Sequence, residues 1–306
     1  MINTLSLINK YATENPSDLI RASEYEYKEQ ISAIANRISL NPDIKIIAIA
    51  GPSASGKTTT AHLVMDEIEK SGENTAVISL DDFYLPLNKL PRLPDGNRDI
   101  ESVSAMDIPR IERAFKDIVN YGSAYIPTFD FLTKSRIENA KKIDVGNRGI
   151  VIVEGLHALN PLITAGVPQK NILKIYISVN TPVEDENGAQ ILSSRQIRLI
   201  RRIIRDKRFR GAEPDETLHL WNNVVAGEAK YLYCFKNTAD IKLVTFHSFE
   251  PCVYKEQFCK MRQTVKPNTP CYDYFIKTAN ALERFLSLDS KTVPENSLIR
   301  EFIGNE

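Results

Sequence analysis

One glycine-containing segment fits the pattern GxxxxGK[ST], in which x stands for any residue. Such a loop can surround a phosphate group, because its glycines let the backbone come close and its N–H groups point inward at a helix N-terminus. Lys57 would reach the β- and γ-phosphates, and the Thr58 hydroxyl would hold Mg²⁺. The segment therefore predicts a nucleoside triphosphate site, whereas a plain glycine-rich turn is disfavoured by the strand expected before it and the helix expected after it. Its residues are Gly51, Pro52, Ser53, Ala54, Ser55, Gly56, Lys57 and Thr58, and Thr59 follows them.

Two carboxylates are expected beside this loop. Asp81 and Asp82 follow the predicted strand 75–80, where an acid could accept a hydroxyl proton or touch the metal. Two adjacent acids cannot both point into one site, so we favour Asp81, with Asp82 as a cap or loop residue. Glu154 ends the apolar strand 149–154, where a buried carboxylate needs a partner such as a hydrated Mg²⁺, a salt bridge or a cap.

Basic residues crowd between residues 195 and 210, where Asp206 is the single acid. Ile197, Ile200 and Ile204 recur at helical spacing, which predicts a helix with one packed edge and a cationic face. A solvated face and a nucleic-acid patch are the usual roles of such a run. Neither explains so much uncompensated charge in a neutral chain, so we favour a lid that closes on transferring phosphoryl groups. The basic residues are Arg195, Arg198, Arg201, Arg202, Arg205, Lys207, Arg208 and Arg210.

The elements that must position these residues alternate between strands and helices. Apolar β-branched runs predict strands, and apolar residues at helical spacing predict helices. The alternation indicates an α/β fold with a mostly parallel central sheet flanked by helices, which binds ligands beyond the carboxyl ends of its strands. The expected strands are 44–50, 75–80, 149–154, 171–178 and 240–244, and the expected helices are 17–40, 57–70, 107–119, 189–207, 214–235, 253–261 and 272–285. Residues 85–99 are expected to form a surface loop.

The composition narrows the class of protein. The 306 residues contain 39 basic and 39 acidic side chains, so the formal charge is zero and a broadly basic nucleic-acid partner surface is not expected. No run of about eighteen uncharged apolar residues occurs, and residues 1–18 lack a secretory pattern, so we expect a cytoplasmic protein without a membrane partner. The cysteines lack usual zinc spacing and are expected to be reduced thiols.

Several longer motifs resemble the uridine kinase and phosphoribulokinase family of P-loop kinases. They are GPSASGKTTT at 51–60, SLDDFY at 79–84, IPTFDF at 126–131, IVIVEGLHALN at 150–160 and RRIIRDKRFRG at 201–211. The similarity extends from residue 28 to the end, and residues 297–304 match without a role that we can derive. The closer resemblance is to the branch of bacterial nucleoside (uridine) kinases, in which a TGS domain often precedes the kinase; we do not expect that domain among these residues.

The resemblance implies a fold and catalytic roles. It implies a P-loop kinase with a helical lid at about 189–212 and a helical C-terminal extension. It also implies that Asp81 accepts the proton of a 5′-hydroxyl near Mg²⁺ and that Glu154 serves the metal alongside Thr58. Arg205 and Arg210 of the lid match positions that contact phosphates.

The resemblance also implies a nucleoside pocket. Asp99 matches the acid that hydrogen-bonds ribose hydroxyls, Tyr84 and Phe129 match aromatic positions that line the pocket, and Arg202 matches a position that reaches the nucleoside. Pyrimidine nucleoside kinases of the better-known type carry Tyr where this chain has Phe129 and His where it has Lys134. Those side chains help to read the base, so their replacement leaves the identity of the acceptor open, with uridine and cytidine favoured.

The function expected from these patterns is ATP- and Mg²⁺-dependent transfer of a phosphoryl group to a primary hydroxyl of a small molecule. One alternative is a kinase of another small alcohol or of a sugar phosphate, for which Arg98, Lys134 and Arg136 would supply further cations. Another is a non-catalytic NTP-binding regulatory protein. The stretch 237–240 lacks the lysine of the guanine-binding motif Asn-Lys-x-Asp, which argues against a GTPase. The choice between ATP and GTP as donor stays open.

We expect three parts in the chain. Residues 1–43 would form an N-terminal helical segment, and residues 44–245 the P-loop kinase core with its lid. Residues 246–306 would form a helical extension that packs on the core or makes a subunit contact, so a homo-oligomer stays open.

Overall fold

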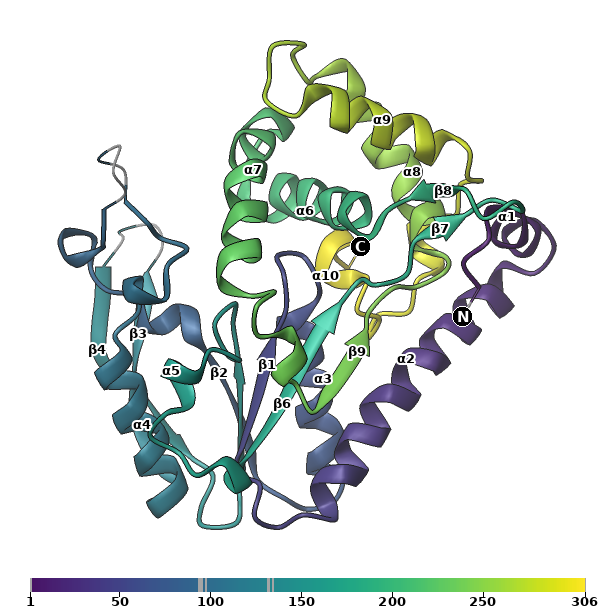
Figure 1. The fold of residues 1–306 in the computed structure, drawn as a ribbon. Coiled ribbons are helices and arrows are strands. Elements are labelled where there is room, and N and C mark those ends of the chain that lie inside the picture. Colours follow the sequence, from purple (N-terminus) through teal and green to yellow (C-terminus); the bar gives the residue numbers. More distant parts are fainter. Residues whose placement is uncertain (1, 93–95, 97, 131–132, 134, 306) are drawn as a thin grey trace.

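The computed structural model describes residues 2–92, 96, 98–130, 133 and 135–305. At its centre lies a five-stranded sheet with the order β2-β5-β1-β6-β9, and every neighbouring pair of strands is parallel (Figure 1). The predicted α/β fold with a parallel central sheet is confirmed, and each strand lies within a predicted segment. The strands are β1 (Ile46–Ala50), β2 (Thr75–Ser79), β5 (Ile150–Glu154), β6 (Ile172–Ser178) and β9 (Ile241–Val244).

Strand β1 is buried on both faces, as its continuous apolar sequence predicts. Ile47 and Ile49 pack into the core on one face of the sheet, and Ile46 and Ala48 pack into the core on the other. Two long helices cover the first face, and a helix with a hairpin covers the second (Figure 1). These elements are α2 (Pro16–Ser39) and α3 (Lys57–Glu69), and α4 (Ile108–Tyr121), β3 (Ser123–Asp130) and β4 (Ser135–Asp144).

The antiparallel hairpin of β3 and β4 was not among the predicted elements. Most side chains of β4 are exposed and polar, so this strand lacks the apolar run that reveals the central strands. Three short elements were also not predicted: α5 (Pro161–Thr164), β7 (Val183–Glu184) and β8 (Gln190–Leu192). Helix α1 (Leu5–Glu14) lies in the segment 1–43 that was expected to be helical, although no separate helix was predicted there.

Most of the remaining helices lie beyond the carboxyl ends of the sheet strands (Figure 1). The helix predicted to begin at residue 189 begins at Ser194, because β8 pairs with β7 and because Ser193 and Gln196 form a capping box. It ends at Gly211, whose φ of +64° suits a glycine at a helix C-terminus. In the described residues, no helix has the length and apolar character needed to cross a membrane. The helices are α6 (Ser194–Arg210), α7 (Pro214–Tyr231), α8 (Glu250–Lys260), α9 (Tyr272–Glu283) and α10 (Arg300–Ile303).

Candidate active site

The glycine-containing loop lies between the end of β1 and the start of α3, as predicted. A Cβ atom at Gly51 would lie 2.6 Å from the carbonyl oxygen of Ile177, and one at Gly56 would lie 2.6 Å from the side chain of Leu298. Gly56 also has a φ of +87°, which residues with a side chain rarely adopt. Both glycines are therefore required for the loop to pack between the sheet and the C-terminal segment.

A cavity of about 510 Å³ opens beside this loop. One end is lined by charged groups and by the loop, and the other end is mostly apolar. The charged end contains Ser53, Ala54, Gly56, Lys57, Thr58, Asp81, Glu154, Arg202, Arg205, Arg210 and Glu301. The other end contains Tyr84, Leu85, Leu87, Leu90, Ile100, Glu101, Phe129, Leu156, Val224 and Glu228.

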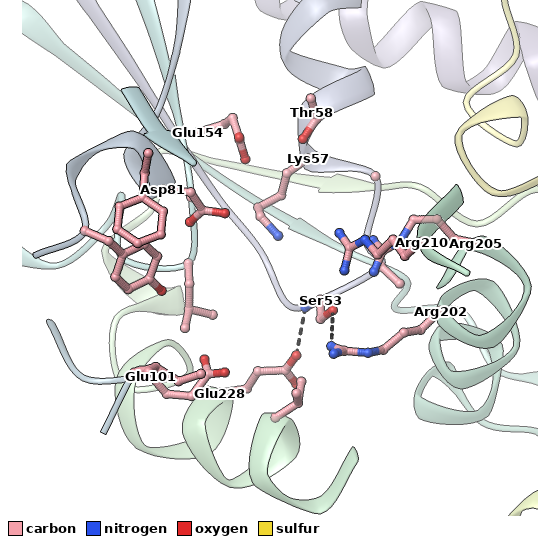
Figure 2. A pocket seen from close by; sticks show the side chains of 18 of the residues that line it. Ser53, Lys57, Thr58, Asp81, Glu101, Glu154, Arg202, Arg205, Arg210 and Glu228 are labelled. Carbon is pink, nitrogen blue, oxygen red and sulfur yellow. Dashed lines mark hydrogen bonds between the residues drawn. The ribbon is translucent and has the colours of Figure 1, made fainter. Parts of the chain in front are cut away.

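The structure separates the two neighbouring acids after β2. Asp81 points into the cavity toward Lys57 (Figure 2). Asp82 instead accepts a hydrogen bond from the backbone N–H of Phe129 at 3.2 Å. This is the arrangement that the sequence favoured, with Asp81 directed inward and Asp82 serving the backbone of β3.

Glu154 lies at the end of β5, the strand next to β2, and its carboxylate accepts a hydrogen bond from the Ser79 hydroxyl at 2.7 Å. Burial raises the pKa of both Glu154 and Asp81, and the positive charge of Lys57 opposes this rise. The negative charge of Asp81 raises the pKa of Glu154 further. A buried carboxylate with a raised pKa is a better proton acceptor than an exposed one.

The expectation of an uncompensated cationic face on α6 is wrong. Arg201 is fully buried, and its guanidinium donates to both carboxylate oxygens of Glu250, at 2.7 and 2.9 Å. Arg198 is also buried and forms an ion pair with Glu228. These carboxylates compensate the two arginines because a buried charge needs a partner. Their pairing is invisible in the sequence, since α8 and α7 supply the acids.

Three further arginines of α6 surround Asp206 at the edge of the cavity. Nitrogen–oxygen distances to this carboxylate are 3.4 Å for Arg202, 2.9 Å for Arg205 and 3.3 Å for Arg210. All three side chains line the cavity, on the side facing Lys57 (Figure 2). The structure therefore brings the predicted phosphate-contacting arginines to the glycine-containing loop.

Ser53 of the loop is bound by side chains from two helices. Its N–H donates to Glu228 at 2.8 Å, and its carbonyl oxygen accepts a hydrogen bond from Arg198 at 2.9 Å. Its hydroxyl accepts one from Arg202 at 2.8 Å (Figure 2). The sequence gave no role to Glu228, and no local pattern signals its contact with the loop.

The apolar end of the cavity contains the predicted aromatic pair. The rings of Tyr84 and Phe129 lie 5.9 Å apart between centroids. Glu101, to which the sequence gave no role, also lines this end. Burial raises the pKa of its carboxyl group, and the positive charge of Arg202 opposes the rise. Asp99, the acid that the resemblance indicated, does not line the cavity and accepts a hydrogen bond from the Tyr231 hydroxyl at 2.9 Å.

One of the predicted substrate-binding cations, Arg136, does not line the cavity. Arg136 lies on β4 and binds Asp107, at 2.9 Å, and Glu138. These carboxylates engage its guanidinium, and Arg136 is not among the residues that line the cavity, so the structure does not support its predicted place among the substrate-binding residues. Lys134 lies outside the described residues.

The first turn of α3 is held by segments from distant parts of the chain. Thr59 donates a hydrogen bond to Glu301 of α10 at 2.6 Å. The next residue, Thr60, shares a hydrogen bond of 2.7 Å with the Tyr27 hydroxyl of α2. The sequence gave no role to Glu301, which also lines the cavity.

The donor atoms at the charged end suit Mg²⁺, which prefers oxygen ligands. Thr58 offers a hydroxyl, and Asp81 and Glu154 offer carboxylates. Within the described part of the chain, no three His, Cys, Asp or Glu side chains converge closely enough to hold a metal by themselves. Mg²⁺ often keeps several waters and is bound through one or two carboxylates together with substrate phosphates, so this donor set fits the ion.

Comparison with known proteins gives the family of the chain. Residues 46–249 match the Phosphoribulokinase / Uridine kinase family, and the chain therefore belongs to this family.

Individual relatives agree with this membership. Uridine-cytidine kinase B of Dictyostelium discoideum is 30% identical over 182 residues, which are 59% of this chain and 65% of that protein. The uridine kinase of Mycoplasma genitalium is 29% identical over 181 residues, covering 59% of this chain and 75% of that protein. A solved structure from Silicibacter sp. TM1040, named for a fructose transport system kinase, covers 69% of this chain and 98% of its own with a TM-score of 0.50. At 18% identity, this last likeness concerns the fold.

Proposed function

We propose that the protein is a kinase that transfers the γ-phosphoryl group of ATP, with Mg²⁺, to the primary hydroxyl of a nucleoside. The observation that carries this proposal is the position of Asp81, which faces Lys57 across the cavity beside the glycine-containing loop. A carboxylate placed there can take the proton of an attacking hydroxyl while the lysine contacts the phosphates. We propose the 5′-hydroxyl of uridine or cytidine as the acceptor group.

Positioning and charge neutralisation supply the rest of the mechanism. Phosphoryl transfer asks for little covalent chemistry from the protein. Backbone N–H groups of the loop hold the phosphates, and Lys57, Arg205 and Arg210 balance the charge that develops on the transferring group. Mg²⁺, when bound by Thr58, Asp81 and Glu154, neutralises phosphate charge. Asp81 receives the hydroxyl proton as the acceptor oxygen forms its bond to the γ-phosphorus and the bond from that phosphorus to the bridging oxygen of ADP breaks, so that ADP leaves.

The apolar end of the cavity supports a neutral acceptor over a sugar phosphate. Tyr84 and Phe129 offer flat apolar surfaces, and Glu101 offers a carboxylate that can accept hydrogen bonds from hydroxyl groups. A phosphorylated acceptor would meet the negative charge of Glu101. Arg98 donates to the backbone carbonyl of Leu87, and Arg136 is paired with acids, so two of the three cations suggested for a phosphorylated acceptor are engaged elsewhere.

Glu101 is also our choice for hydroxyl recognition. It lines the cavity, whereas Asp99 is bonded to Tyr231 on α7. The resemblance assigns the ribose hydroxyls to Asp99, and this assignment stays a prediction that substitution can test.

A cytoplasmic location, where ATP is plentiful and thiols stay reduced, belongs to the same proposal. It is supported by the free thiols of the cysteines, which are Cys234, Cys252, Cys259 and Cys271.

The direct test is an acceptor panel. Purified protein is incubated with ATP and Mg²⁺ and with uridine, cytidine, ribulose 5-phosphate or no acceptor, and ADP release is measured together with the phosphorylated product. We expect uridine or cytidine to stimulate ADP release and the Lys57→Ala variant to show none. Stimulation by the sugar phosphate alone would favour the alternative acceptor. Nucleotide binding without any product in the panel would favour a regulatory protein.

A further inference from the structure

The segment Ser297–Gly304 forms part of the wall of the nucleotide cavity. Leu298 packs against Gly56, so closely that a Cβ atom on the glycine would collide with it. Glu301 lines the cavity and accepts the hydrogen bond from Thr59, which directly follows the proposed magnesium ligand Thr58. The C-terminal segment therefore brings a carboxylate to the phosphate end of the site, from outside residues 46–249, the range of the family match.

Several contacts fix this segment in place. The Ser297 hydroxyl donates to Glu24 of α2. The guanidinium of Arg300 donates to the carbonyl oxygens of Val293, Pro294 and Gly304, which ties the segment into a compact turn. The ring of Phe302 lies 4.9 Å from the guanidinium carbon of the buried Arg201. With its neighbours held on both sides, Glu301 has a defined position rather than that of a mobile end.

The charge of Glu301 acts on the groups proposed to bind phosphate and metal. Burial and the negative charge of Asp81 raise the pKa of Glu154, and the positive charge of Lys57 opposes this rise. The negative charge of Glu301 raises the pKa further. Burial and Arg205 lower the pKa of Arg210, and Glu301 opposes this. A carboxylate so close to the phosphate end repels a metal-free polyphosphate and attracts a divalent cation.

We propose that Glu301 is a third carboxylate of the nucleotide site and makes the site select the magnesium-bound nucleotide over the metal-free nucleotide. Asp81 and Glu154 are the other two carboxylates at this end. The proposal rests on the proposed function to the extent that a nucleotide must occupy the loop. It adds a residue that the loop motif does not contain and gives the C-terminal segment a part in recognition.

The test measures the dissociation constant of ADP by calorimetry, once with Mg²⁺ and once with a chelator. The selectivity ratio is the dissociation constant of metal-free ADP divided by that of Mg²⁺-ADP, and it is compared between each variant and the wild type. In Glu301→Gln, which keeps the shape and removes the charge, metal-free ADP is expected to bind more tightly relative to Mg²⁺-ADP, so that the selectivity ratio falls about three- to fivefold. The matched control is Glu295→Gln, because Glu295 is an exposed carboxylate two residues before the segment; its ratio should equal that of the wild type.

A purely structural role would give a different result. Leu298→Ala removes packing beside the loop without changing charge, and it is expected to weaken both forms of ADP equally. If Glu301→Gln behaves in the same way, with an unchanged ratio, the proposal is overturned. Failure of the proposed function is recognised separately, since the wild type would then bind no ADP or Lys57→Ala would bind it as well as the wild type.

Discussion

The carboxylate of Glu228 accepts a hydrogen bond of 2.8 Å from the backbone N–H of Ser53, across 175 positions of sequence. The same carboxylate pairs with Arg198, which in turn donates to the carbonyl oxygen of Ser53. The start of the glycine-containing loop is thus bound to both α6 and α7. We infer that this network keeps the loop in shape before any ligand arrives, which lowers the entropic cost of binding.

Replacing Glu228 by Gln tests this network. The amide can still accept from Ser53, but it leaves the buried Arg198 without a charged partner. We expect the free energy of unfolding to fall by about 3–5 kcal/mol and ADP to bind more weakly. Urea unfolding and calorimetry measure the two effects. The double variant Arg198→Met/Glu228→Gln should recover part of the stability, and a double variant as unstable as the sum of both single changes would contradict the pairing.

Asp81→Asn tests the proton acceptor. An amide cannot take the hydroxyl proton, so turnover should fall roughly 100- to 10,000-fold while ADP binding is largely kept. The matched control is Asp82→Asn, because Asp82 is bonded to the Phe129 backbone and not directed into the cavity. Steady-state kinetics separate the variants. Near-normal turnover in Asp81→Asn would show that another group accepts the proton.

The same substitution should stabilise the ligand-free protein at neutral pH. Burial raises the pKa of Asp81 in the folded state above its ordinary value of 3.8, so ionisation of this group opposes folding. This loss of stability is absent at pH values below the ordinary pKa of 3.8 and fully present at pH values above the raised pKa of the folded state. Urea unfolding from about pH 4 to neutral pH should therefore show that Asp81→Asn gains stability over the wild type as the pH rises. A stability difference that does not change with pH would argue that Asp81 is not the titrating group.

Glu101→Gln and Asp99→Asn together test acceptor recognition. Loss of the Glu101 charge weakens hydrogen bonds to acceptor hydroxyls, so the KM for the acceptor should rise about three- to tenfold with the KM for ATP unchanged. Asp99→Asn should change the acceptor KM less, because its partner is Tyr231. The reverse order of effects would return this role to Asp99, as the resemblance implies.

The sequence predicted the parts of the molecule whose signals are local. Strands β1, β5 and β6 are covered on both faces, so most of their residues are apolar. The loop motif directly follows β1. The geometry then placed Asp81 as expected, because the carboxyl ends of parallel strands meet at one edge of the sheet.

Features that depend on tertiary pairing could not be predicted. The sequence placed Arg201 on a cationic face, yet it is buried and forms an ion pair with Glu250, which lies 49 positions away in the sequence. Strand β4 is held by hydrogen bonds to β3, and its sequence contains too few apolar residues to predict a strand. Glu301 and Glu228 reach the cavity through the packing of α10 and α7, which no spacing within their own segments encodes.

The hydroxyl groups of Thr59 and Thr60 are bound by Glu301 and Tyr27, and neither partner falls within residues 46–249, the stretch that matches the family. An excised fragment limited to those residues would leave the first turn of α3 without both supports and would uncover the apolar surfaces of α3 and α6. For this chain, residues 46 and 249, which bound the family match, are therefore a poor guide to where the gene can be cut for expression, and the useful boundaries lie outside Tyr27 and Gly304.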